Sequence, residues 1–327
     1  PLWVASDNAL IFSDIPGNKM HRWRPGSSEA EVYRDPSGHS NGLTLDHDGN
    51  VLACEHSGRR VSRAPYDGTA EAIVTTFDGK TLNSPNDLVV HSSGAIYFTD
   101  PSYGIPRPGQ TRVLGDPEAV QEIDYQGVFR IATDGTLTLL TDDLIMPNGL
   151  AFSPDESVLY IADSSERRVI RRFEVQSDGS LSGGEVFVDM SDDERRGVPD
   201  GMKLDEDGRI WSTGAGGVWV IEPDGHRLGV FETEEHAANL TFGGADFSTL
   251  FLTASTSVYS VETAVRGVVP GSRELMRRSD PCVKRASSAT GPSTAPERTS
   301  HSDAPIVLAP MPARSEPSGM KPAIASE

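Results

Sequence analysis

The sequence predicts an all-β fold, a six-bladed β-propeller with four-stranded blades around a central channel. Five segments share one pattern, in which a polar residue precedes an apolar strand, a tight turn and a second apolar strand. The polar residues are Asn41, Asn86, Asn148, Asp200 and Asn239. The first residues, PLWVASDNALIFSD, repeat the strand, turn and strand without the polar residue. Self-similarity at spacings of a few tens of residues is typical of propellers, so six copies predict six blades.

Two further strand-like runs separate successive polar residues, and these complete a four-stranded blade. GVFRIAT and TLTLLTD, for example, lie between Asn86 and Asn148. Pairs such as Asp134-Gly135 supply the positive φ angles that tight hairpin turns need. Because equivalent residues of all blades in a ring point to one axis, we expect the five polar side chains to meet in the central channel.

Residues 1–267 are expected to form the propeller, and residues 268–327 a disordered tail. No Phe, Tyr or Trp occurs from Arg266 onward, where Ser, Ala and Pro dominate, and such a segment cannot bury a core. The last blade shows only three clear strands. We therefore expect an N-terminally truncated chain, in which the fourth strand of that blade and the polar residue of the first blade precede Pro1.

The composition excludes several classes of partner. The net charge is −19, and a strongly acidic body disfavours nucleic acid and anionic membrane surfaces. No apolar run is long enough to span a membrane. Cys54 and Cys282 form no disulfide framework, and Cys54 is expected to be a small buried apolar residue. We expect a small-molecule partner, a monomer or weak dimer, and a cytoplasmic or periplasmic location.

The five polar residues also suggest a metal site. Asn and Asp at strand starts lower β propensity, so the sheet gains nothing from them. A ring of amide oxygens and one carboxylate suits Ca²⁺, with Zn²⁺, Mg²⁺ and Mn²⁺ as alternatives. The competing interpretation is that each side chain only caps its local turn.

Four motifs resemble the gluconolactonase branch of the SMP-30/gluconolactonase/luciferin-regenerating-enzyme-like family over roughly residues 1–267. They are SPNDLVV at 84–90, YFTDPSYG at 97–104, MPNGLAFSPDESVLYIAD at 146–163 and VPDGMKLDEDGRIW at 198–211. The resemblance implies one divalent metal ion at the channel mouth of a six-bladed propeller. It implies Asn148 and Asp200 as metal ligands, a third Glu ligand upstream of Pro1, and Asn86 as a substrate contact.

The implied activity is that of a gluconolactonase-like carboxylic ester hydrolase, which opens a sugar lactone of the glucono-1,5-lactone type to the aldonic acid. A divalent cation would polarise the lactone carbonyl, and Asp200 would take the proton of the attacking water as general base. Asn86 would donate to the oxyanion or to a ring hydroxyl. Asn41, Asn239 and His56 are further candidate substrate contacts. No G-x-S-x-G motif supports a serine hydrolase.

Residues 101–126 form an insertion between Asn86 and Asn148. Over the channel mouth, its Tyr103, Arg107 and Arg112 would shape substrate choice, although a simple surface loop is the alternative. Asp100 and Asp163 close second strands and are expected to brace the channel Asn residues.

A competing hypothesis is a propeller binding module or an inactive truncated fragment without catalysis. Because the Glu ligand is missing from the sequence, we expect this chain to be weakly active or inactive, and a longer parent protein to be the lactonase.

Overall fold

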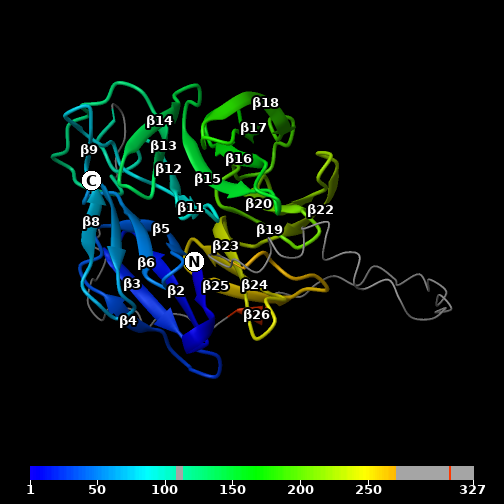
Figure 1. Ribbon diagram of the computed structural model, residues 1–327. Coiled ribbons are helices and arrows are strands. Elements are labelled where there is room, and N and C mark those ends of the chain that lie inside the picture. The colour runs from blue at the N-terminus through cyan, green and yellow to red at the C-terminus, as the bar shows by residue number, and fades with distance from the viewer. Residues whose placement is uncertain (108–112, 270–308, 311–327) are drawn as a thin grey trace, which may run out of the picture.

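The computed structural model describes residues 1–107, 113–269 and 309–310. Six four-stranded antiparallel sheets surround one axis as the blades of a propeller, which confirms the predicted fold (Figure 1). The first strand of each blade contacts the first strand of the next blade, so these six strands form the inner wall of the ring. Successive strands of a blade then pair outward from the axis in chain order.

The blades follow one another along the chain. The first three are β1 (Leu2–Val4), β2 (Ala9–Asp14), β3 (Lys19–Trp23) and β4 (Glu31–Arg34); β5 (Ser40–Leu45), β6 (Val51–Glu55), β7 (Arg60–Ala64) and β8 (Glu71–Val74); and β11 (Leu88–Val90), β12 (Ile96–Asp100), β13 (Gly127–Ile131) and β14 (Leu137–Thr141). The last three are β15 (Pro147–Phe152), β16 (Val158–Asp163), β17 (Val169–Val175) and β18 (Leu181–Asp189); β19 (Met202–Leu204), β20 (Ile210–Gly214), β21 (Gly217–Ile221) and β22 (Arg227–Glu232); and β23 (Ala237–Gly243), β24 (Thr249–Ala254), β25 (Val258–Glu262) and β26 (Ala309–Pro310). A small hairpin of β9 (Thr76–Phe77) and β10 (Lys80–Thr81) and a 3₁₀ turn, η1 (Ala5–Asp7), complete the elements.

Acidic side chains shape the turns between the first and second strands. The Asp46 carboxylate accepts hydrogen bonds from the backbone N–H groups of Asp48 and Asn50, at 3.0 and 2.9 Å. Gly49 then takes a φ of 79°, which a residue with a side chain rarely adopts. Asp205 repeats this arrangement in the fifth blade. The acidic clusters around these two residues are therefore hairpin turns.

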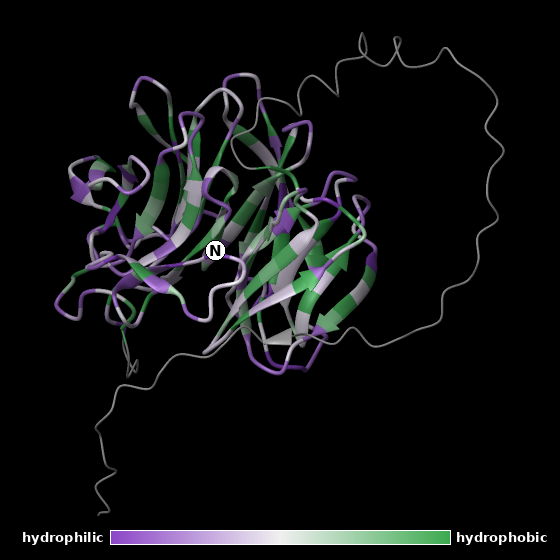
Figure 2. Cartoon of the chain, turned by 90° about the horizontal axis from the view of Figure 1, so that it is seen from below, coloured by the Kyte–Doolittle hydropathy of each residue, from purple (hydrophilic) through white to green (hydrophobic). Residues whose placement is uncertain are grey.

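The apolar core lies between neighbouring blades. Phe98 of the third blade stacks on Phe129 of the same blade, and both pack against Cys54 and Leu52 of the second blade. Cys54 is buried and unpaired, as expected. Trp3 of β1 stacks on Phe251 of β24 with 5.2 Å between ring centroids, so the first and last blades are in contact and the ring closes. Figure 2 shows the same division, with apolar residues along the strands and polar residues in the loops.

The sixth blade differs from the expected incomplete sheet. β26 pairs antiparallel with β25 and occupies the fourth position of that blade. An unpaired strand edge exposes N–H and C=O groups that any extended segment can satisfy, which accounts for this pairing. Most of the expected tail, residues 270–308 and 311–327, lies outside the described residues, as does Cys282. The described part of the chain contains no helix with the length and apolar character that a membrane crossing requires.

Candidate functional site

The polar residues predicted from the repeats meet at one end of the central channel. Asn41 Nδ2 donates a hydrogen bond to Asn86 Oδ1 at 2.9 Å, although 45 residues separate them in the chain. A backbone hydrogen bond joins two further blades in the same way, since the N–H of Gly149 donates to the carbonyl of Asp200 at 3.1 Å. The side chains therefore lie at the junctions between blades rather than in isolated turns.

Glycine allows this close approach. A Cβ added to Gly149 would lie 2.1 Å from the carbonyl oxygen of Asp200, and one added to Gly201 would lie 2.2 Å from the side chain of Asn239. Neither glycine has a positive φ. Each is needed because the next blade leaves no room for a side chain, and not because the backbone turns there.

Asn148 is held in place on several sides. Its side chain is buried, and its Nδ2 donates to Ser164 Oγ at 2.9 Å and to the Tyr103 hydroxyl at 3.4 Å. Thr99 Oγ1 donates to the backbone carbonyl of Asn148 at 2.9 Å. Because Nδ2 makes the hydrogen bonds to protein, the amide oxygen is the atom that can serve as a ligand.

Asp200 and Asp87 form the negative centre of the site. Asp200 is partly accessible to solvent, yet it lies deep among protein atoms. Burial, followed by the charge of Asp87, raises the pKa of the Asp200 carboxyl to about 7, while a hydrogen bond from Asn148 opposes this shift. Asp87 is buried, and its Oδ2 accepts a hydrogen bond from Asn239 Nδ2 at 3.3 Å.

Asp87 is a residue that the sequence reasoning missed. The only signal is its position, because it follows Asn86 where three other blades have a glycine after the polar residue. The structure also limits the predicted role of Asn239. Its Nδ2 is bonded to Asp87, and its Oδ1 accepts the N–H of Leu240 at 2.7 Å, so both polar atoms are used within the protein.

The beginning of the insertion covers Asn148. Ser84 Oγ donates to the carbonyl of Pro101 at 2.5 Å and accepts the N–H of Gly104 at 2.9 Å, which fixes Tyr103 between them. Burial and the charge of Asp200 raise the pKa of Tyr103 to about 12, so the phenol is neutral at neutral pH. The Arg107 guanidinium lies 5.6 Å from the centroid of the Tyr103 ring.

The two other residues predicted for this region are Arg112 and His56. Arg112 lies outside the described residues. His56 is buried against the insertion, with Nδ1 2.9 Å from the carbonyl of Leu114, and burial lowers its pKa to about 4. Its Nε2 has no hydrogen-bond partner within the described ranges, and no hydrogen bond there joins His56 to the five polar residues.

Asp100 and Asp163 brace the segments that lead to Asn86 and Asn148. The Asp163 carboxylate accepts the backbone N–H groups of Ile145 and Met146 at 3.1 and 3.0 Å. Asp100 Oδ2 accepts the N–H of Asn83 at 2.7 Å, and burial raises the pKa of the Asp100 carboxyl to about 7. Both carboxylates thus bind backbone in front of the polar residues.

The donor set at this end of the channel fits a hard divalent cation. Across residues 1–107 and 113–269, no three His, Cys, Asp or Glu side chains converge on one point. The Asn148 side chain and the Asp200 carboxylate are nevertheless neighbours, and the nearby Asp87 carboxylate disfavours the charged form of Asp200. A cation between these oxygens would relieve that repulsion, and oxygen ligands of this kind suit Ca²⁺.

The chain is similar to known proteins in both sequence and fold. The family model for the SMP-30/Gluconolactonase/LRE-like region matches residues 1–256. A gluconolactonase of Zymomonas mobilis is 34% identical over 82% of this chain and 78% of its own. The pentonolactonase XacC of Haloferax volcanii is 30% identical over 78% of this chain and 80% of its own. The solved structure of a gluconolactonase from Xanthomonas campestris is 36% identical, with a TM-score of 0.72 over 82% of this chain and 85% of its own.

Proposed function

The chain belongs to the SMP-30/gluconolactonase/LRE-like family, and we propose that it hydrolyses a sugar lactone of the glucono-1,5-lactone type to the aldonic acid. It is a lactone-hydrolysing enzyme of the gluconolactonase type. The observation that carries the proposal is the meeting of Asn148, Asp200 and Asn86 at one end of the channel, where two of the resembling motifs are joined by the Gly149–Asp200 backbone contact.

The metal ion is part of the same proposal. Asn148 and Asp200 would hold one divalent ion through an amide oxygen and a carboxylate, with Ca²⁺ favoured by the hard oxygen donors. When bound, such an ion supplies Lewis-acid polarisation of the lactone carbonyl and lowers the pKa of a neighbouring water. The support is the chemistry of the donor set and the closeness of Asp87 to Asp200.

Residues of the chain itself would transfer the proton and hydrogen-bond the substrate. Asp200 accepts the proton of the attacking water as general base. Asn86 Oδ1 accepts from Asn41, and Asn86 Nδ2 makes no hydrogen bond within the described ranges, so it can donate to the developing oxyanion or to a sugar hydroxyl. The Asn41 amide oxygen can accept from another sugar hydroxyl, because its Nδ2 makes the bond to Asn86.

Substrate selection is assigned to the start of the insertion. Tyr103 is a neutral hydroxyl donor next to Asn148, and Arg107 stacks on its ring. Together they offer the sugar an aromatic edge, a hydroxyl and a cation at the rim of the site. His56, which is neutral and further inside the insertion contact, would act on substrate only through this loop.

Hydrolysis of glucono-1,5-lactone, followed by proton release, tests the proposal. In contrast to the weak or absent activity expected from the sequence, we expect turnover that EDTA abolishes, that Ca²⁺ or another divalent ion restores, and that is lost in Asp200→Asn. Turnover that is unaffected by EDTA and by Asp200→Asn would contradict the proposed site. Retained metal binding without hydrolysis of any small lactone would favour the binding-module alternative instead.

A further inference from the structure

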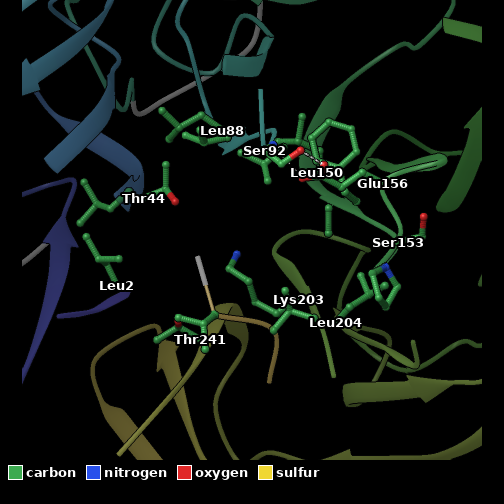
Figure 3. A pocket seen from close by; sticks show the side chains of 18 of the residues that line it. Leu2, Thr44, Leu88, Ser92, Leu150, Ser153, Glu156, Lys203, Leu204 and Thr241 are labelled. Atoms are coloured by element: carbon green, nitrogen blue, oxygen red, sulfur yellow. Dashed lines mark hydrogen bonds between the residues drawn. The ribbon is translucent and has the colours of Figure 1, made fainter. Parts of the chain in front are cut away.

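A cavity lies in the channel beyond the polar residues, and its volume is about 110 Å³. None of the five polar residues lines it. Its wall consists mainly of Leu, Val, Ala and Phe side chains from the inner strands, so it is chemically unlike the candidate active site (Figure 3).

The strand register places six equivalent residues around this cavity, one from each blade. In each blade, the inner-strand residue pairs with the second-strand residue that lies three positions before that strand ends. The pairs are Leu2 with Ile11, Thr44 with Leu52, Val89 with Tyr97, Ala151 with Tyr160, Lys203 with Trp211 and Thr241 with Phe251. All six inner-strand residues line the cavity, and five of them are uncharged. The fifth blade alone contributes a charge at this position.

Lys203 has no carboxylate partner in the part of the chain that the structure describes. Its Nζ donates to the carbonyl of Met202 at 2.9 Å, and Figure 3 shows the amine in the open space between Leu2, Thr44 and Thr241. The carboxylate on the cavity wall, Glu156, is engaged with the backbone N–H of Ser92 at 2.8 Å and with that residue's hydroxyl. Lys203 is partly accessible to solvent, so its ammonium group can form a charge-assisted hydrogen bond with a carboxylate that enters the cavity.

We propose that this cavity binds a short aliphatic monocarboxylate, with its carboxylate on Lys203 and its carbon chain against the apolar wall. A somewhat larger apolar cavity, of about 150 Å³, accommodates benzene, so the ligand here has about three to five carbons. Thr44, which faces Lys203 across the cavity, is placed to donate a hydroxyl to the carboxylate. A polyhydroxylated sugar acid fits this wall less well, because many of its hydroxyl groups would lie against Leu, Val and Ala side chains.

Titration of ¹³C-labelled butyrate with the protein, monitored by NMR in the presence of EDTA, tests this proposal. EDTA removes metal-bound carboxylate from the active-site end, so the outcome does not depend on the proposed lactonase mechanism. We expect saturable butyrate binding, binding of 1-butanol and gluconate that is at least about tenfold weaker, and a loss of at least about tenfold in Lys203→Met.

Lys80→Met is the matched control, because Lys80 is exposed in β10 and does not line the cavity. It should bind butyrate as the wild-type protein does. Far-UV circular dichroism establishes that Lys203→Met is folded, and Lys203→Gln replaces it if it is not. Equal affinity of wild type and the Lys203 variant, equal binding of butyrate and 1-butanol, or no saturable binding would overturn the proposal.

Discussion

The two ends of one channel differ in how they are packed. At the polar end, backbone of one blade touches backbone of the next, as where the N–H of Gly149 meets the carbonyl of Asp200 at 3.1 Å. At the other end, Thr44, Ala151 and Thr241 are too short to fill the axis, and a cavity of about 110 Å³ remains. The residues just before or near the start of the inner strands thus build a tight polar site, whereas residues further along those strands leave an apolar space.

This difference has a physical reason. The polar residues lie where chain enters the inner strands, so hydrogen bonds between blades and the braces from Asp100 and Asp163 can fix them. Further along the strands, backbone hydrogen bonds are already used within each blade, and only side-chain volume decides how far the channel is filled. Position in the blade therefore determines whether a side chain is fixed by hydrogen bonds between blades or only fills space.

Asp200→Asn should have the largest effect. Loss of a general base lowers kcat by roughly 10²–10⁴-fold, while the fold is retained because the amide is nearly isosteric with the carboxylate. Steady-state hydrolysis of glucono-1,5-lactone measures the loss. Asp192→Asn, the same change at an exposed position on the same loop, should leave kcat unchanged. Equal kcat values in the two variants would show that the reaction does not take place at the polar end of the channel.

Asn148→Ala should weaken metal binding without abolishing the fold. The variant removes an amide oxygen from the proposed ligand set, and we expect Ca²⁺ affinity to fall at least about tenfold. Calorimetric titration with Ca²⁺ measures this fall directly. Asn50→Ala, which alters an Asn in a hairpin turn, is the control and should retain the affinity. Undiminished binding by the Asn148 variant would place the ion elsewhere.

Gly149→Ala tests whether the polar end is as tightly packed as its contacts indicate. The added Cβ would lie 2.1 Å from the carbonyl oxygen of Asp200, so backbone must shift, and overpacking of this kind costs about 1–3 kcal/mol. Thermal or urea unfolding measures the cost. Gly229→Ala is the matched control, since no atom lies within 4 Å of its added Cβ. A Gly149 variant as stable as the control would show that the blades separate easily.

The repeats in the sequence predicted the fold and brought together residues far apart in the chain, as the Asn41–Asn86 hydrogen bond shows. They could not predict Asp87, whose partner Asn239 lies 152 residues away in another blade. Nor could they predict Lys203 in the cavity, because the repeats alone do not give the strand pairing that determines which residue of β19 faces the channel. The sequence pattern identifies which residues begin a strand but not which atoms are already bonded.

The pH dependence of stability should come largely from the polar end, and Asp100→Asn gives the smallest and most specific test. Burial raises the pKa of the Asp100 carboxyl from its ordinary value of 3.8 to about 7. The folded state therefore holds a proton that the unfolded chain releases between these values. The stability contributed by that proton is fully present below about pH 4 and is lost as the pH rises to about 7.

Asp100→Asn removes this titration. The free energy of unfolding should consequently fall less steeply between pH 4 and pH 7 than in the wild-type protein, by at most about 1.4 kcal/mol per pH unit. Urea unfolding at several pH values, with EDTA present, measures the two slopes. Asp134→Asn is the control, because a hydrogen bond from the backbone of Thr136 lowers the pKa of that exposed carboxyl, so it does not titrate in this range. If the Asp100 variant and the wild type had parallel profiles, the Asp100 carboxyl would be ionised in the folded protein throughout, and its bond to the Asn83 backbone would be that of a carboxylate rather than of an acid.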